Sequence, residues 1–300
     1  MKAPASMRKG DQPASQNSSS SWQALCDPDH GIATAGTRSP VRPLLLVAHP
    51  DDETVGAATF LSRTTDGIVV FCTDGAPIDS KLWSPDAAGG SRESYALMRR
   101  QEAYAALHLL GIDGEWVRFL DAVDQDAVFS LSRLIEDFIS TLARYRPDIV
   151  ITHAYEGGHP DHDAASLIAR VAINAVESDY RPVLAEMPLY HARDNQYVLA
   201  QFLPTLQDGT SGPQELILQL SAEEIARKQQ MIGCHRSQRL VLAGFPLECE
   251  RFRLAPAYNY SESPYPGKLW YECMGWSMTG DRWRELATRA LAAKRTTACS

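Results

Sequence analysis

Two short clusters of histidines and carboxylates are the part of this sequence best suited to chemistry. Residues 48–53 read Ala-His-Pro-Asp-Asp-Glu and directly follow the apolar run 44–47. Residues 159–163 read His-Pro-Asp-His-Asp and come shortly after the apolar run 149–151. Carboxylates this close repel one another and raise each other's pKa, and a divalent cation relieves that repulsion. The two clusters therefore predict one metal site that is assembled from two loops.

Three residues of these clusters form a plausible ligand set. His49 and Asp52 are three positions apart, so both can face one point if the chain turns here from a strand into a helix. His162 can then supply the third ligand from the second cluster. Zinc in hydrolases usually takes three protein ligands and leaves a further position open. The nitrogen and oxygen donors suit Zn²⁺, and also Fe²⁺, Co²⁺ or Mn²⁺.

Asp51, His159 and Asp161 are the candidate catalytic residues beside this ligand set. A metal of this kind lowers the pKa of a water molecule and polarises a carbonyl. Asp51 would then act as general base, and His159 would stabilise the oxyanion or protonate the leaving amine. Asp161 would orient a histidine through its ring N–H. His159 and Asp161 have a simpler alternative, which is to cap the helix that follows them.

The two motifs together resemble the PIG-L/LmbE-like family of zinc-dependent N-acetylglucosaminyl deacetylases. The resemblance covers roughly residues 42–240, with further matches at Thr73-Asp74-Gly75, Arg99-Arg100-Gln101-Glu102-Ala103, Lys228 and Ser237-Gln238. It implies a Rossmann-like fold and a hydrolase that removes an N-acetyl group from an N-acetylglucosamine-type sugar or conjugate. It also implies that zinc is held by His49, Asp52 and His162, with Asp51 as the base and His159 as the electrophilic helper.

Four other polar residues are candidates for substrate binding, namely Asp74, Arg99, Arg100 and Glu156. Either arginine could reach a sugar hydroxyl or a phosphate, or could form an ion pair on a solvated helix face. Asp74 could equally be a turn residue before a glycine. Glu156 precedes two glycines, so a flexible loop could bring it toward the substrate.

Alternating strands and helices must position these residues. The apolar runs predict strands at 43–47, 67–73, 116–120, 148–152, 183–190 and 215–220. Helical spacing and capping residues predict helices at 54–63, 92–110, 130–145, 164–177, 221–235 and 281–294. This alternation indicates an α/β fold, with a Rossmann-like, mainly parallel sheet and helices on both faces. Ligands of such sheets bind beyond the carboxyl ends of the strands, where both clusters fall.

The ends of the chain differ from its middle. Residues 1–40 are rich in serine and other polar residues, which indicates a disordered tail. Residues 41–300 then form a single domain, with a loop-rich C-terminal extension from about residue 240. The aromatic segment 255–280 predicts a cover over the sheet edge or over the mouth of the site.

The composition limits the partners of this protein. A net charge of −8 and a pI near 5.5 argue against nucleic acid or an anionic membrane surface. No run of 18 apolar residues is present, so we expect no membrane span. The six cysteines are scattered without a CxxC pair, which favours a reduced, cytoplasmic setting. We expect a small-molecule amino-sugar conjugate as the partner, and a homo-oligomer is compatible with the sequence.

Two other functions stay open at this level. A metal-dependent hydrolase of another amide or of a phosphoester would use the same residue types, although two-metal phosphatases usually need more ligands. A non-catalytic Rossmann-like binding module is the other alternative. Against it, no G-x-G-x-x-G follows the first predicted strand.

Overall fold

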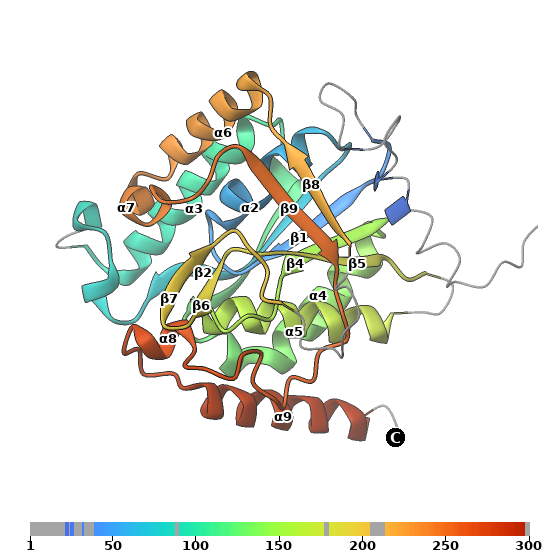
Figure 1. The fold of residues 1–300 in the computed structure, drawn as a ribbon, viewed down its shortest axis with the longest axis vertical. Helices are drawn as coiled ribbons and strands as arrows, with labels where there is room; N and C mark the ends of the chain where they lie inside the picture. The colour runs from blue at the N-terminus through green and yellow to red at the C-terminus, as the bar shows by residue number, and fades with distance from the viewer. Residues whose placement is uncertain are drawn as a thin grey trace, which may run out of the picture.

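A central β-sheet with helices on both faces forms the body of the molecule (Figure 1). The structure is a computed structural model that describes residues 22–23, 25–26, 32, 39–87, 90–176, 180–204 and 214–297. The strands of the sheet are β1 (Pro43–Val47), β2 (Ile68–Pro77), β3 (Val117–Asp124), β4 (Ile149–His153), β5 (Val183–Met187), β8 (Glu215–Gln219) and β9 (Cys249–Leu254). They lie in the order β3-β2-β1-β4-β5-β9-β8.

The strand directions confirm the predicted α/β fold class. Strands β1 to β5 are parallel wherever they pair with one another. Strand β9 is antiparallel to both of its neighbours, β5 and β8. The sheet is therefore mainly parallel, with a mixed edge.

The helices form two layers that enclose two cores. One layer holds α2 (Asp52–Ser62), α3 (Arg92–His108) and α6 (Ala222–Cys234), and the other holds α4 (Leu131–Tyr145), α5 (Pro160–Ala175) and α9 (Gly280–Thr297). Successive side chains of a strand point to opposite faces of its sheet. Leu44 and Leu46 of β1 accordingly pack in one core, while Leu45 and Val47 pack in the other.

Several short elements complete the fold. They are the two-stranded hairpin of β6 (Tyr190–Arg193) and β7 (Gln196–Leu199), and the short helices α7 (Arg239–Leu242) and α8 (Trp270–Cys273). The strand predicted over 183–190 is divided between β5 and β6 because Pro188, which has no N–H, interrupts the ladder. None of the described helices combines the length and the apolar composition that crossing a membrane requires.

The predicted tail over residues 1–40 lies mostly outside the described residues. Trp22, Leu25 and Ile32 are described, and all three are buried in the core that also contains Leu45 and Val47. Part of the predicted tail therefore packs on the domain. In the same way, β9 falls inside the predicted extension from about residue 240, yet it is a strand of the central sheet.

Candidate metal centre

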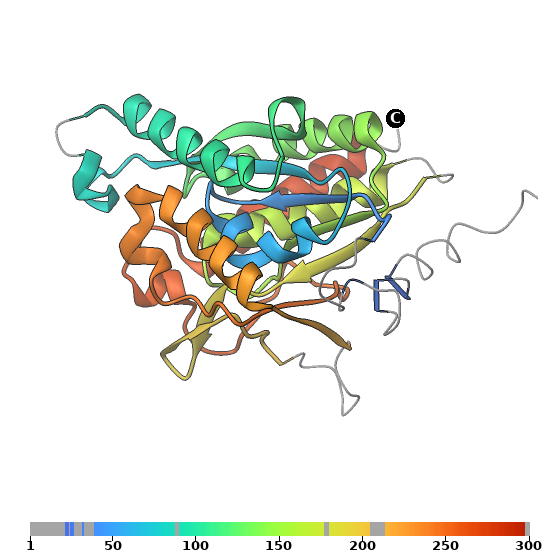
Figure 2. The same cartoon turned by 90° about the horizontal axis from the view of Figure 1, so that it is seen from above.

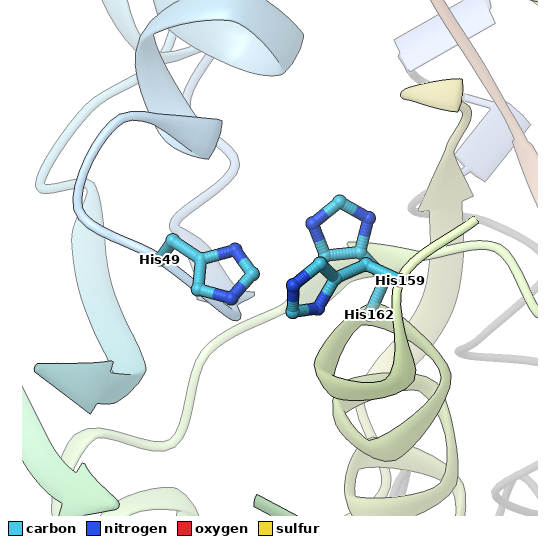
Figure 3. A group of neighbouring side chains, drawn as sticks. All are labelled: His49, His159 and His162. Carbon is cyan, nitrogen blue, oxygen red and sulfur yellow. The ribbon is translucent and has the colours of Figure 1, made fainter. Parts of the chain in front are cut away.

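The carboxyl ends of β1 and β4, which are neighbours in the sheet, bring the two clusters together. A turn after β1 carries His49 and leads into α2, whose first residue is Asp52. The second cluster opens α5, with His159 as the N-cap and Pro160 as the first residue. Figure 3 shows His49 from the first loop facing His159 and His162 from the second. All of these side chains are buried.

Asp52 lies between the two histidines that were predicted to share a metal with it. Its Oδ2 is 3.3 Å from Nδ1 of His49, and its Oδ1 is 3.5 Å from Nε2 of His162. The backbone N–H of His49 also donates to Oδ2 of Asp52 at 2.7 Å, which fixes the turn between them. Burial favours the neutral carboxyl, but the surrounding imidazoles of His162, His153 and His49 hold the pKa of Asp52 well below its usual range.

The donor atoms of this cluster fit a divalent cation. Nε2 of His162 is buried and has no hydrogen-bond partner among the described residues, although it faces a carboxylate oxygen. Buried polar atoms are rarely left unpaired, so an orphaned imidazole nitrogen here points to a missing ligand. Three overlapping groups have ligand atoms within 4.8 Å of one another: His49/His159/His162, His49/Asp124/His159/Asp161 and Asp52/His153/His162.

Asp51 is held at the edge of the same cluster by Arg99. The guanidinium of Arg99 donates to Oδ2 of Asp51 at 3.0 Å, and also to the carbonyl oxygens of Pro50 and Gly75. Burial raises the pKa of Asp51 to about 7, against the opposing effect of the Arg99 cation. Of the two arginines predicted from the sequence, Arg99 is the one that contacts the cluster, and its role in binding substrate stays a prediction.

His159 caps α5, which is the simpler of the two roles that the sequence left as alternatives. Its Nδ1 accepts the backbone N–H of Asp161 at 3.1 Å, so the ring caps α5. The ring proton must then be on Nε2, which faces Oδ1 of Asp124 at 3.9 Å. Burial and the neighbouring His49 and His162 keep the pKa of His159 well below its usual range, which favours the neutral ring.

Asp161 is fully buried beneath the cluster, where its carboxylate contacts His49. Its Oδ2 is 3.2 Å from Nε2 of His49, and its two oxygens accept the backbone N–H groups of Gln125 and Ala127. A carboxylate in this position fixes the orientation of the imidazole ring. The histidine that it contacts most closely is His49, since Nδ1 of His159 is 4.0 Å away.

Two buried residues of the cluster were missed from the sequence as candidates for the site. Asp124, at the end of β3, places Oδ1 3.3 Å from Nε2 of His49. His153, at the end of β4, lies 3.3 Å from Oδ2 of Asp52 and stacks on His162 with ring centroids 4.0 Å apart. Both are polar residues at the carboxyl end of a parallel strand, and that position in the sequence could have identified them as candidates for the site.

Three of the predicted substrate-binding residues lie elsewhere. Asp74 forms a turn with the N–H of Ala76 and an ion pair with Arg92 at 2.6 Å. Arg100 pairs with Asp121 at the surface. Glu156 is buried and accepts the backbone N–H of Leu203 at 2.9 Å. None of the three lines the pocket beside the cluster.

A pocket of about 430 Å³ opens onto the cluster. His49, Asp51, Asp52 and His159 form its floor together with Arg99, Asp124 and Gln125. Its walls come from distant parts of the chain: Tyr95 of α3, Tyr190 of β6, Gln238 and Leu240–Leu242 around α7, and Trp270, Met274 and Trp276 of the aromatic segment. The predicted cover therefore borders the mouth of the site.

The fold and the cluster define a class of protein: a Rossmann-like α/β domain with a buried histidine–carboxylate centre at the carboxyl ends of its strands. Residues 44–173 match the family model described as PIG-L, GlcNAc-PI de-N-acetylase. The match supports the resemblance to the PIG-L/LmbE-like family that the two sequence motifs carry.

Two curated bacterial proteins illustrate the sequence similarity. The chain is 27% identical over 178 residues to a mycothiol S-conjugate amidase of Streptomyces coelicolor, an alignment that covers 50% of this chain and 60% of that protein. It is 31% identical over 174 residues to a 1D-myo-inositol 2-acetamido-2-deoxy-alpha-D-glucopyranoside deacetylase of Geodermatophilus obscurus, covering 49% and 58%. The chain thus spans less than two thirds of the length of either relative.

Solved structures support the fold. One neighbour is a deacetylase of the A40926 pseudoaglycone, with a TM-score of 0.53, 22% identity and coverage of 74% of this chain and 99% of that one. Another is the N,N'-diacetylchitobiose deacetylase of Pyrococcus horikoshii, with a TM-score of 0.52, 19% identity and coverage of 79% and 92%.

Proposed function

We propose that this chain is a metal-dependent amidohydrolase that removes an N-acetyl group from an amino-sugar conjugate, with zinc as its metal. The observation that carries this proposal is the convergence of His49, Asp52 and His162 with Asp51 and His159 beside one pocket. The names of the two curated relatives, an amidase and a deacetylase of an acetamido sugar, support the same reaction class.

The metal and the side chains have separate tasks. A zinc ion held by His49, Asp52 and His162 would polarise the amide carbonyl and lower the pKa of a water. Asp51 is the residue that we assign as general base, because it lines the pocket beside these ligands. Arg99 engages Oδ2 of Asp51, so Oδ1 is the oxygen that we assign to the proton of the attacking water.

His159 is the donor in the proposed reaction. Because Nδ1 accepts the N–H that begins α5, the ring presents its Nε2 proton toward the pocket. That N–H group can donate a hydrogen bond to the oxyanion. The proton that Asp51 takes from the water is the one that can pass to the departing nitrogen. Oδ1 of Asp124 lies 3.9 Å from the same nitrogen, so its negative charge would favour the ring form that is protonated there.

The first test measures metal content and acetate release together. Purified protein is analysed for transition metals and incubated with a panel of N-acetylglucosamine conjugates, with and without a chelator. We expect roughly one metal per chain, as a three-ligand site predicts, and acetate release that the chelator abolishes. His108→Ala removes an exposed histidine that pairs with Asp113 and serves as the matched control, with unchanged metal content and activity.

The other outcomes are equally informative. Metal without acetate release from any conjugate would contradict the deacetylase proposal and direct the search to other amides and to phosphoesters. Failure to bind metal after reconstitution would contradict the whole mechanism. A cytoplasmic location and a homo-oligomer stay predictions from the sequence.

A further inference from the structure

His153, the last residue of β4, contacts both loops of the metal centre. The residue is only 1% exposed. Its Nε2 accepts the backbone N–H of Ala48 at 2.9 Å, directly before the predicted ligand His49. Its ring also stacks on the ring of His162, with 7° between the two planes and centroids 4.0 Å apart. Strands β1 and β4 lie side by side in the middle of the sheet, with helices on both faces (Figures 1 and 2).

Ala48 is held from both neighbouring strands. The pairing of β1 with β4 ends at Leu46 and Thr152, and Ala48 lies beyond it. At this point the imidazole of His153 replaces a backbone acceptor for the Ala48 N–H. From the other side, the N–H and the hydroxyl of Thr73 both donate to the carbonyl oxygen of Ala48, at 3.0 and 2.9 Å. The backbone that leads into the first cluster is therefore fixed on β2 and on β4.

The bond from Ala48 decides the tautomer of His153. Oδ2 of Asp52 is 3.3 Å from the same Nε2, so this nitrogen has a donor and an acceptor beside it. A backbone N–H always carries its proton, and burying it without an acceptor costs free energy. Oδ2 of Asp52 already accepts the N–H of His49. Nε2 is therefore the unprotonated nitrogen, and the ring proton is on Nδ1, a buried atom without a partner among the described residues.

The same geometry makes His153 a poor metal ligand, although its donor atoms lie close to those of Asp52 and His162. A zinc ion binds about 2.0–2.1 Å from an imidazole nitrogen, along a lone pair in the plane of the ring. Two nearly parallel rings with centroids 4.0 Å apart cannot both direct a lone pair at one ion. The lone pair of Nε2 is also occupied by the N–H of Ala48.

Stacking on His153 orients the ring of His162. Metal-bound histidines usually donate their second ring nitrogen to a carboxylate or a carbonyl, which fixes the ring. In the described part of the chain, no hydrogen bond of this kind is made by His162. The ring of His153 lies closest to it, because the centroids of Tyr190, His49 and His159 are 5.0 to 5.2 Å away.

We propose that His153 is a positioning residue of the metal centre. It fixes the backbone before His49 through Nε2 and the ring plane of His162 through stacking, and it does not bind the metal itself. This inference rests on the proposed function and adds a residue to its site. Ligands that come from separate loops must keep their relative geometry to bind one ion, and a side chain that contacts both loops supports that geometry.

The test compares two substitutions that each keep a different part of the interaction. His153→Gln keeps an acceptor that can reach the N–H of Ala48, whereas His153→Phe keeps a flat ring and has no acceptor. Zinc affinity is measured by competition with a chromophoric chelator. The phenylalanine variant should bind zinc about 10–100-fold more weakly, and the glutamine variant should lose less than about tenfold. His108→Phe, at an exposed histidine that pairs with Asp113, is the control and should keep the parent affinity.

Nitrogen NMR of the isotopically labelled, metal-free parent gives a readout that needs neither a metal nor a variant. We expect the ring proton of His153 on Nδ1, and a nitrogen–nitrogen coupling across the hydrogen bond between Nε2 and the amide of Ala48. A proton on Nε2 would overturn the proposal, even if the phenylalanine variant fails to fold. Urea denaturation of the metal-free variants shows whether each one folds.

Two results of the affinity measurement would also overturn the proposal. One is an unchanged affinity in a folded phenylalanine variant. The other is an equal loss in both variants, because a metal ligand would lose its bond in either. X-ray absorption of the zinc-loaded proteins checks the second case, since an imidazole that disappears from the zinc in His153→Gln would identify His153 as a ligand.

Acetate release separates the positioning role from the reaction. Zinc affinities in the expected order, without acetate release from any conjugate, would support the role of His153 and contradict the deacetylase. Acetate release by a parent protein whose zinc affinity the phenylalanine substitution leaves unchanged would support the deacetylase and overturn the role of His153.

Discussion

Replacing Lys228 by methionine should lower the free energy of unfolding by about 3–5 kcal/mol. Lys228 is only 1% exposed, and its ammonium donates to the carbonyl oxygen of Val55 at 2.7 Å and to Oε1 of Glu250 at 2.9 Å. Methionine has a similar length without the charge. The substitution would leave the Glu250 carboxylate buried without its cation, and the Val55 carbonyl without its donor.

These contacts complete an interrupted helix. Ala57 in α2 has a non-helical backbone (φ −149°, ψ 16°). In a regular helix the N–H of Thr59 would donate to the carbonyl of Val55. Here the N–H groups of Thr59 and Phe60 donate to the two oxygens of Glu250, each at 2.9 Å. The Lys228–Glu250 pair thus replaces the helix hydrogen bonds that are lost around Ala57. These bonds lie in α2, the helix that begins at the predicted metal ligand Asp52.

The expected loss of unfolding free energy follows from the interactions that the Val55 carbonyl and the Glu250 carboxylate lose. An unpaired buried carbonyl costs about 1–3 kcal/mol, and removal of one partner of a buried ion pair costs about 3–5 kcal/mol in all. The two N–H donors still stabilise the Glu250 carboxylate in the variant. We therefore expect the lower end of this range, about 3 kcal/mol.

Urea denaturation followed by far-ultraviolet circular dichroism measures this loss. Arg282→Met breaks an exposed ion pair with Glu285 and serves as the control, with a change within about 0.5 kcal/mol. The double variant Lys228→Met/Glu250→Gln should recover part of the loss, because it removes the unpaired charge. A Lys228→Met protein within about 1 kcal/mol of the parent would refute the reasoning.

Four further predictions concern the site and the fold. Asp51→Asn should keep the metal and lose at least about 10²-fold in turnover; near-normal acetate release would show that the base is another group. His162→Ala should lose metal affinity in titrations with a metal indicator, and unchanged affinity would contradict the ligand set. Hydrogen bonds from Arg63 hold the pKa of Glu224 below its usual value. This carboxylate therefore stabilises the fold at pH values above its unfolded-state pKa. The contribution disappears as the pH falls through the folded-state pKa. Glu224→Gln should therefore cost roughly 1–2 kcal/mol in urea denaturation near pH 7 and almost nothing at about pH 2–3; an equal cost at both pH values would contradict this. Gly158→Ala would place a Cβ atom 1.8 Å from a backbone oxygen of β6, so thermal stability and acetate release should both fall, and no change in either would exclude the clash.

The sequence was sufficient to predict those features that depend on residues close together in the chain. The apolar runs located β1 and β4, and the clusters that follow them converge as expected for the carboxyl ends of parallel strands. Ser221 and Glu224 form a capping box at the start of α6, where the sequence predicts a helix over 221–235. Strand periodicity and helix caps depend on neighbours within a few residues, so they can be read without knowing the fold.

Tertiary structure decided which of the nearby polar residues reach the site. Arg99 and Arg100 are adjacent in the sequence, but the packing of α3 against β2 turns Arg99 toward Asp51 and leaves Arg100 at the surface. Asp124 and His153 joined the cluster because β3 and β4 end at the same edge of the sheet as β1. Strand β9 entered the sheet between β5 and β8 by pairing with segments distant in the sequence. Strand order and the rotation of a helix about its axis depend on contacts between such distant segments, so they cannot be read from neighbours within a few residues.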